Sequence, residues 1–188
     1  MAERADAARN RRAIMAATED LLGRFEPSQV SIERIAAAAG VGKATVFHRF
    51  GSRAELMHTL AVERAEALRL AVLEGPPPLG PGAPARERLI AFTDAMVELA
   101  SRTIGLLTAA EQATIAAGVS RQENPVHVFW HDHVAALLAE ARPGIDADLQ
   151  ADVILSTLHE QSFVRLLRSG ERDRVAAALR DLVTALTG

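Results

Sequence analysis

Apolar side chains recur along this chain with the 3.6-residue period of an α-helix. Over residues 11–25, one face of the expected helix carries Ile14, Thr18, Leu21, Leu22 and Phe25. Further on, Ile32, Ile35, Ala36 and Ala39 fall at positions i, i+3, i+4 and i+7. Stripes of this kind are typical of helices that cover a hydrophobic core. The pattern predicts an all-α protein.

Residues 31–50 are predicted to form two short helices joined by Gly40, Val41 and Gly42. Gly40 supplies the positive φ that often ends a helix. Val46 and Phe50 lie one turn apart and can pack against the first helix. The outer face of the second helix keeps Lys43, Thr45, His48 and Arg49. A positive, hydrogen-bonding face suits a DNA major groove, so the pair indicates a helix-turn-helix. A purely structural helical hairpin is the alternative.

A long helix is predicted over residues 53–74, because Ser52 and Glu55 form a capping box at its start. It ends at the proline-rich stretch 75–84. Five further helical segments are expected at about 85–101, 103–118, 124–141, 146–169 and 172–187. Segment 85–101 is apolar on several sides, which predicts a helix buried all round. Asp146 is the expected N-cap of segment 146–169.

The stretch from about Arg9 to about Ala67 closely resembles the N-terminal domain of TetR-family transcriptional repressors. The matching residues are Ile14, Ala17, Leu21, Leu22, Phe25, Ser31, Ile32, Ile35, Ala36, Ala39, Gly40, Val41, Thr45, Val46, Phe47, Phe50, Ser52, Arg53 and Leu56. The rest of the chain is similar to the family only in its helical pattern and its length.

This resemblance implies a helix-turn-helix DNA-binding domain over residues 9–67 and a helical ligand-binding and dimerisation domain over 68–188. The implied DNA-contacting residues are Ser31, Gly42, Lys43, Ala44, Thr45, Phe47, His48, Arg49 and Arg53. Lys43 can reach guanine acceptors, while Ala44 or the Thr45 methyl can touch thymine. Ser31, Phe47 and Arg53 are expected on phosphates and sugars.

Three positions depart from the family pattern. Gly42 stands where the family usually has a Ser or Thr that N-caps the recognition helix. Phe47 replaces the usual Tyr, so we expect van der Waals contact with the DNA backbone and no hydrogen bond. Arg53 replaces the usual Lys and keeps the ability to bind phosphate.

Charge is divided unevenly along the 188 residues, whose formal net charge is −3. Residues 1–53 hold nine Lys and Arg against six Asp and Glu, and residues 54–188 hold twelve against eighteen. This asymmetry favours a nucleic-acid surface near the N-terminus. Arg4, Arg9, Arg11 and Arg12 either follow the DNA backbone or belong to a solvated terminus.

The chain has no cysteine, no run of 18 apolar residues and a polar start, so disulfides, a membrane span and a signal peptide are not expected. A cytoplasmic location is the default interpretation.

In the family, the C-terminal domain normally binds a small inducer and its last two helices form a two-fold dimer interface. The candidate pocket residues are Phe92, Met96, Leu99, Leu107, His127, Trp130, His131, His159 and Phe163. The candidate interface residues are Ile154, Leu158, Gln161, Arg165, Leu179, Leu182 and Val183. A plain packed core is the alternative for the aromatic set.

His127 and His131 share a helix face at i and i+4, a spacing that can bind a metal. Ordinary hydrogen-bonded or surface histidines are the favoured interpretation, and we expect no cofactor and no enzymatic activity. The sequence therefore predicts a homodimeric repressor that binds a palindromic operator and responds to a largely apolar effector. A constitutive DNA-binding protein and a histidine-based metalloprotein or enzyme are the alternatives.

Overall fold

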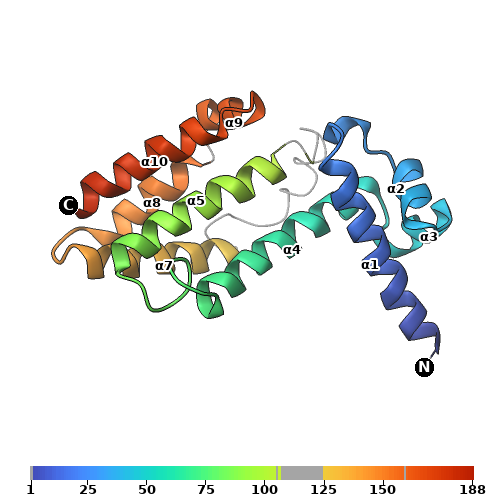
Figure 1. Cartoon of the computed structure of the whole chain (residues 1–188), viewed down its shortest axis with the longest axis horizontal. Coiled ribbons are helices and arrows are strands. Elements are labelled where there is room, and N and C mark those ends of the chain that lie inside the picture. The colour runs from blue at the N-terminus through green and yellow to red at the C-terminus, as the bar shows by residue number, and fades with distance from the viewer. Residues whose placement is uncertain (1, 105, 107–124, 159) are drawn as a thin grey trace. The chain divides into compact units, whose positions relative to one another are not determined.

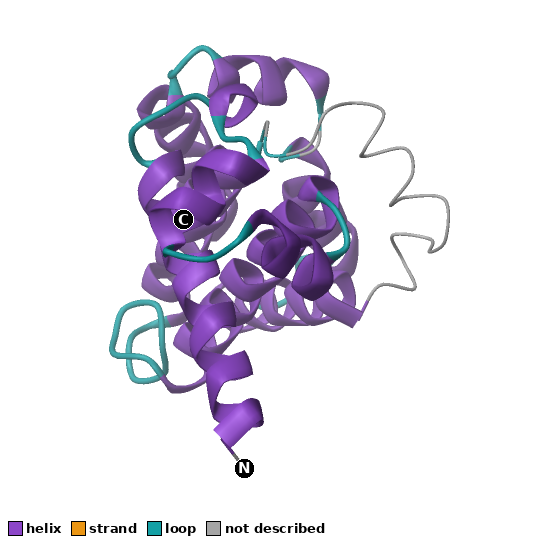
Figure 2. Ribbon diagram, turned by 90° about the vertical axis from the view of Figure 1, so that its right-hand side faces the viewer, coloured by secondary structure: helices purple, strands orange, loops and turns teal. Residues whose placement is uncertain are grey.

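The computed structural model describes residues 2–104, 106, 125–158 and 160–188, and within these ranges it contains helices and loops only (Figures 1 and 2). The helices are α1 (Ala2–Leu22), η1 (Pro27–Gln29), α2 (Ile32–Ala39), α3 (Lys43–Phe50), α4 (Arg53–Glu74), α5 (Ala85–Thr103), α7 (Pro125–Ala141), α8 (Ala147–Thr157), α9 (Gln161–Arg168) and α10 (Arg172–Thr187). The all-α class is confirmed. Most of the helix predicted over 103–118 lies outside the described residues.

The first compact unit contains the described residues up to Val62 together with Leu106. Its core brings together one face of each helix and is formed by Ile14, Met15, Leu21, Val30, Ile32, Ile35, Ala36, Val46, Phe50, Leu56, Met57, Leu60 and Leu106. The stripes predicted from the sequence point inward here. Thr18 is also fully buried, and its hydroxyl donates to the Ile14 carbonyl at 2.7 Å.

Local hydrogen bonds fix both ends of α2 and the start of α4. The Ser31 hydroxyl oxygen accepts from the Arg34 amide at 3.3 Å and so caps α2. Gly40 follows with φ 67°, and the Val41 amide donates to the Ala36 carbonyl at 3.0 Å. This is a Schellman ending, which requires the left-handed conformation that glycine adopts freely. The Glu55 amide donates to Ser52 Oγ at 3.1 Å, as the capping box predicts.

The first helix differs from the segment predicted over 11–25, since α1 spans Ala2–Leu22. Its added N-terminal part consists largely of alanine and arginine, which favour helix even without an apolar stripe. The helix stops before Gly23, whose amide still reaches the Glu19 carbonyl at 3.0 Å.

The second compact unit contains Glu63–Ile104 and the described residues from Pro125 onward. Helix α5 packs against α7, α9 and α10, and α7 packs against α8 (Figure 1). Leu89, Phe92 and Val97 of α5 are at most 1% exposed. The prediction that this helix is buried all round is wrong, because Ile90, Met96 and Leu99 are only partly buried and Arg86 and Glu87 are exposed.

The single helix predicted over 146–169 is wrong, because the structure has two helices there. Asp146 caps α8 as expected, its side chain accepting from the Leu149 amide at 3.2 Å. At Glu160 the backbone becomes extended, with φ −67° and ψ 138°. The Glu160 carboxylate accepts a hydrogen bond from the Ser162 amide and thereby starts α9.

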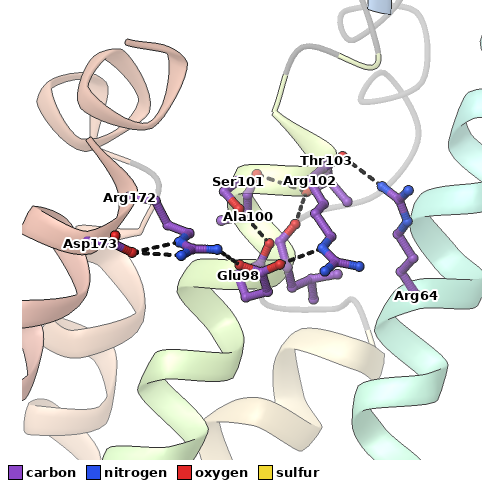
Figure 3. Close-up of polar contacts among 9 residues, drawn as sticks. Arg64, Glu98, Ala100, Ser101, Arg102, Thr103, Arg172 and Asp173 are labelled. Carbon is purple, nitrogen blue, oxygen red and sulfur yellow. Dashed lines mark hydrogen bonds and ion pairs between the residues drawn. The ribbon is translucent and has the colours of Figure 1, made fainter. Parts of the chain in front are cut away.

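Ion pairs and hydrogen bonds tie several helices of the second unit together near the end of α5 (Figure 3). Arg172, at the start of α10, pairs with Glu98 of α5 at 2.7 Å. Arg64 of α4 donates to the Arg102 carbonyl at 2.7 Å. These contacts join the C-terminal half of α4 and the first turn of α10 to the same part of α5.

Candidate functional site

Helix α3 has two chemically different faces. Val46 is fully buried and Phe50 is 7% exposed, so this side is fixed in the core of the first unit. Lys43, Ala44, His48 and Arg49 are exposed. Thr45 is half-buried and Phe47 is 42% exposed. The structure thus presents an eight-residue helix whose outer face is basic and whose inner face is anchored.

Lys43 begins α3 and contacts two neighbours. Its ammonium forms an ion pair with the Glu33 carboxylate on the first turn of α2. It also lies 5.6 Å from the centroid of the Phe47 ring, within range of a cation–π contact. The hydrogen bond from Lys43 is the largest cause that lowers the pKa of Glu33 to about 2, with further hydrogen bonds from the Glu33 backbone amide and the Ser31 hydroxyl.

Gly42 is the N-cap of α3, with φ −72° and ψ 148° and no side chain to accept a hydrogen bond. The Thr45 amide instead reaches the Gly42 carbonyl at 2.9 Å. The backbone amides at the start of α3 therefore lack a capping side chain of the Ser or Thr kind.

Arg53 lies half-buried at the start of α4, and its guanidinium donates to three backbone carbonyls of the first unit. The acceptors are Val30 at 3.1 Å, Leu106 at 3.3 Å and Pro27 at 2.7 Å. Sequence reasoning placed this residue on a DNA phosphate. The structure instead shows it clamping η1 and Leu106 to α4, a contact that no local sequence signal indicates.

The basic N-terminal residues belong to α1. Arg9 pairs with Asp6 at 2.7 Å, with both side chains more than half exposed. The guanidinium of Arg11 lies 5.4 Å from the centroid of the Phe50 ring. Arg12 is exposed, and the side chain of Arg4 lies outside the described atoms.

An aromatic cluster occupies the interface of α5 and α7 in the second unit. The rings of Phe92 and Trp130 are 5.4 Å apart, and Phe129 lies 5.0 Å from Trp130. His133, one turn beyond Phe129, meets the Phe92 ring edge-on at 5.0 Å. Sequence reasoning selected Phe92 and Trp130 but left out Phe129 and His133. The i, i+4 spacing of Phe129 and His133 was the signal that could have placed them together.

Two nitrogen atoms at this cluster are buried without a hydrogen-bond partner in the described part of the chain: Arg88 Nε and His133 Nε2. Burial, and then repulsion by the Arg88 charge, lower the pKa of His133 to about 4. His133 is therefore neutral near pH 7. Together these residues form a largely apolar cluster with two buried polar nitrogen atoms.

The other candidate pocket residues are dispersed. Met96 and Phe163 pack at the edge of the core, and Leu99 and His127 are half-buried. His131 faces α8, with Nε2 3.3 Å from the Asp148 carbonyl oxygen. The remaining two candidates, Leu107 and His159, lie outside the described residues.

The candidate dimer residues separate into two groups. Ile154, Leu158, Leu179 and Val183 are at most 4% exposed and form part of this chain's own core. Buried side chains cannot supply contact area to a second copy without rearrangement. Gln161 and Arg165 are exposed, and Leu182 is 37% exposed. Sequence reasoning omitted Leu149 and Val153 of α8, which are 56% and 44% exposed.

Among the residues that the structure describes, no group of three or more His, Cys, Asp or Glu side chains could hold a metal ion. None of the described helices combines the length and hydropathy that a membrane span requires.

Comparison with known proteins agrees with this architecture. Residues 14–60 match the sequence model of bacterial regulatory proteins of the tetR family. The structure is similar to that of a TetR transcriptional regulator from Streptomyces coelicolor, with 23% identity, 94% of this chain and 98% of that chain covered, and a TM-score of 0.61. A TetR regulatory protein from Mycobacterium vanbaalenii has 26% identity, with 89% and 97% covered and a TM-score of 0.52.

A third similar structure is the transcriptional regulator FadR from Bacillus subtilis in complex with stearoyl-CoA. It has 16% identity, with 94% of this chain and 97% of that chain covered and a TM-score of 0.57. A search of curated protein sequences found no match. The matched residues 14–60 include α3 with its exposed basic face. The similar structures cover nearly the whole chain. Residues 14–60 accordingly match the tetR family of bacterial regulatory proteins, and the fold of nearly the whole chain is similar to that of TetR regulators.

Proposed function

We propose that this chain is a repressor that binds a palindromic operator as a homodimer and leaves it when a small effector binds. The observation that carries the proposal is the exposed basic face of α3, held in place by the buried Val46 and Phe50. A rigid helix with this face is suited to the DNA major groove.

The outer residues of α3 have distinct expected roles. Lys43 reaches guanine acceptors, and Ala44 and the Thr45 methyl contact thymine. His48 and Arg49 extend the polar face along the helix. Phe47, at 42% exposure, contributes van der Waals contact with the DNA backbone. One short helix makes few base contacts, so two copies that bind half-sites about 34–36 Å apart increase the specificity.

The second copy is proposed to bind on the exposed side of α8 and α10. Leu149 and Val153 are one turn apart on α8, and Leu182 lies on α10. Gln161 and Arg165 of α9 add a polar border. An apolar centre with polar residues around it is the usual composition of a protein interface.

The effector is proposed to bind at the aromatic cluster of α5 and α7. Phe92, Phe129 and Trp130 suit a largely apolar molecule. The nitrogen atoms Arg88 Nε and His133 Nε2 supply the polar contacts that fix its orientation. That the similar FadR structure contains stearoyl-CoA supports a ligand with a long apolar part.

Helix α4 is proposed to transmit the effect of effector binding to the DNA-binding helix α3. Its residues up to Val62 belong to the first unit, and those from Glu63 onward belong to the second. Arg64 joins α4 to the end of α5 through the Arg102 carbonyl (Figure 3). A shift of α5 on effector binding would therefore move α4 and change the spacing of the two α3 helices. Couplings of this kind are typically about 1–3 kcal/mol.

Selection of bound sequences from random duplex DNA by the purified full chain tests the proposal. We expect a palindrome with half-sites one helical turn or a multiple apart. Lys43→Ala should weaken operator binding by about 1–3 kcal/mol and relax the preference at one base pair. Enrichment of no sequence, or of single asymmetric sites, would contradict the proposal. Titrating apolar molecules against the bound operator then tests effector release.

A further inference from the structure

The residue expected to read a base, Lys43, already has an anionic partner within the protein. Glu33 lies on the first turn of α2, across the Gly40–Gly42 turn, and its carboxylate pairs with the Lys43 ammonium. The Lys43 and Glu33 side chains are 53% and 60% exposed. Glu33 is the only acidic residue between positions 31 and 50. One negative charge thus lies at the end of α3 that enters the groove.

The Glu33 carboxylate is fixed by more than Lys43. Its own backbone amide and the Ser31 hydroxyl also donate hydrogen bonds, and together with Lys43 they lower its pKa to about 2. Glu33 is therefore ionised near pH 7. Lys43 is the mobile member of the pair, because its four-carbon chain is flexible and also reaches the Phe47 ring.

The strength of the Lys43–Glu33 ion pair determines which DNA groups can take the place of Glu33 beside Lys43. An exposed ion pair contributes at most about fivefold to an equilibrium constant. A good side-chain contact to a base edge discriminates by about fivefold to 150-fold. A guanine edge can therefore take Lys43 from Glu33. On a duplex without the operator sequence, a phosphate offers Lys43 only a screened charge. The ion pair with Glu33 therefore competes effectively with that phosphate for Lys43.

We propose that Glu33 limits the operator affinity of the DNA-binding surface, because Lys43 must leave this carboxylate before it can reach a base edge. This inference rests on the proposed DNA-binding function. Glu33 does not contact the base in this scheme. It acts through Lys43, and its effect is to lower operator affinity by the strength of the ion pair.

The test compares the full chain with its Glu33→Gln variant on the selected operator and on a scrambled duplex of equal length. Glu33→Gln should raise operator affinity by up to about fivefold, because the ion pair no longer has to break, and should raise affinity for the scrambled duplex by less. The salt slope on the scrambled duplex should steepen by about one, because one more cation reaches phosphate. Asp20→Asn on α1 is the matched control, since it frees Arg24, which follows that helix, from an exposed pair of the same kind and should change neither affinity nor slope.

A Lys43→Met background separates the proposed route from simple repulsion between Glu33 and DNA. If Glu33 acts through Lys43, Glu33→Gln should have no effect once Lys43 is absent. An equal gain in both backgrounds, or an unchanged operator affinity in the single variant, would overturn the inference while operator binding remains. Failure of the unmodified chain to prefer any duplex would refute the proposed function, and with it this role of Glu33.

Discussion

At the residue scale, Lys43 and Arg53 have different roles although both are basic residues in the same predicted surface. Lys43 is exposed and held by a single weak pair that DNA can replace. Arg53 is half-buried and binds the carbonyls of Pro27, Val30 and Leu106. The geometry of its planar guanidinium is what allows three separated carbonyls to be reached at once.

Arg53→Lys keeps the positive charge but removes this fork of donors. We expect the free energy of unfolding to fall by about 1–3 kcal/mol, because partly buried carbonyls lose hydrogen bonds from a charged group. Urea denaturation of the full chain measures the change. The exposed Arg49→Lys is the control and should stay within about 0.5 kcal/mol of the original. A stable Arg53→Lys variant would mean that charge alone matters at this position, as a phosphate contact requires.

His133 should make stability depend on pH. Its pKa is lowered from 6.5 to about 4 in the folded chain, chiefly by burial and then by Arg88. Between these values the unfolded chain binds a proton that the folded chain does not, so stability is complete above about pH 6.5 and decreases as the pH falls. The urea midpoint should therefore drop between pH 7 and pH 5.

In His133→Phe this pH-dependent drop should be smaller, because the ring is kept and the titrating group is lost. The exposed His48→Phe serves as the comparison and should keep the full drop. Identical pH profiles for the original chain and His133→Phe would show that another group is responsible.

At the element scale, the helix ends that the sequence predicted correctly are those determined by one or two nearby residues. Gly40, the Ser52–Glu55 box and Asp146 act within four residues of their partners, so the sequence contains the whole cause. The break between α8 and α9 was missed, because the apolar period continues through it and Glu160 is an uncommon cap. The Arg53 clamp was missed for another reason: its acceptors lie 23 to 53 residues away in the sequence.

A single substitution at the start of α3 should raise the stability of the protein. Gly42 has extended backbone angles, and a Cβ placed there would meet nothing closer than Thr45 Oγ1 at 3.8 Å. Gly42→Ser should therefore cap α3 and raise the free energy of unfolding by a few tenths of a kcal/mol. Urea denaturation measures this gain.

Gly42→Asp provides the contrast in DNA binding. It should cap the helix as well as serine does, but its charge adds to that of Glu33 at the end of α3 expected in the groove. We therefore expect unchanged or higher stability together with weaker operator binding. Equal operator affinities for the serine and aspartate variants would show that this end of α3 lies away from the DNA phosphates.

At the scale of the whole molecule, charge and exposed apolar residues are distributed unequally between the two parts of the chain. Residues 1–53 carry a formal charge of +3, from nine basic and six acidic residues, and residues 54–188 carry −6, from twelve and eighteen. The basic part matches the tetR-family sequence model and carries the exposed α3. The acidic part provides the exposed apolar residues of α8 and α10. In the proposed function, attraction to DNA is therefore confined to the first unit, and association with a second copy is left to the other.

Glutamate at the centre of the proposed interface tests this division of roles. Val153→Glu combined with Leu182→Glu should give a monomer by light scattering, because apposed charges in an apolar contact are costly. Operator affinity should then fall by at least about tenfold, since each α3 must bind its half-site without the help of the other. Leu70→Glu on α4, where the side chain is 43% exposed, is the matched control. A dimer that survives the double substitution would place the interface elsewhere. A monomer that keeps full operator affinity would show that one α3 suffices for operator binding. There would then be no physical reason for the operator to be a palindrome.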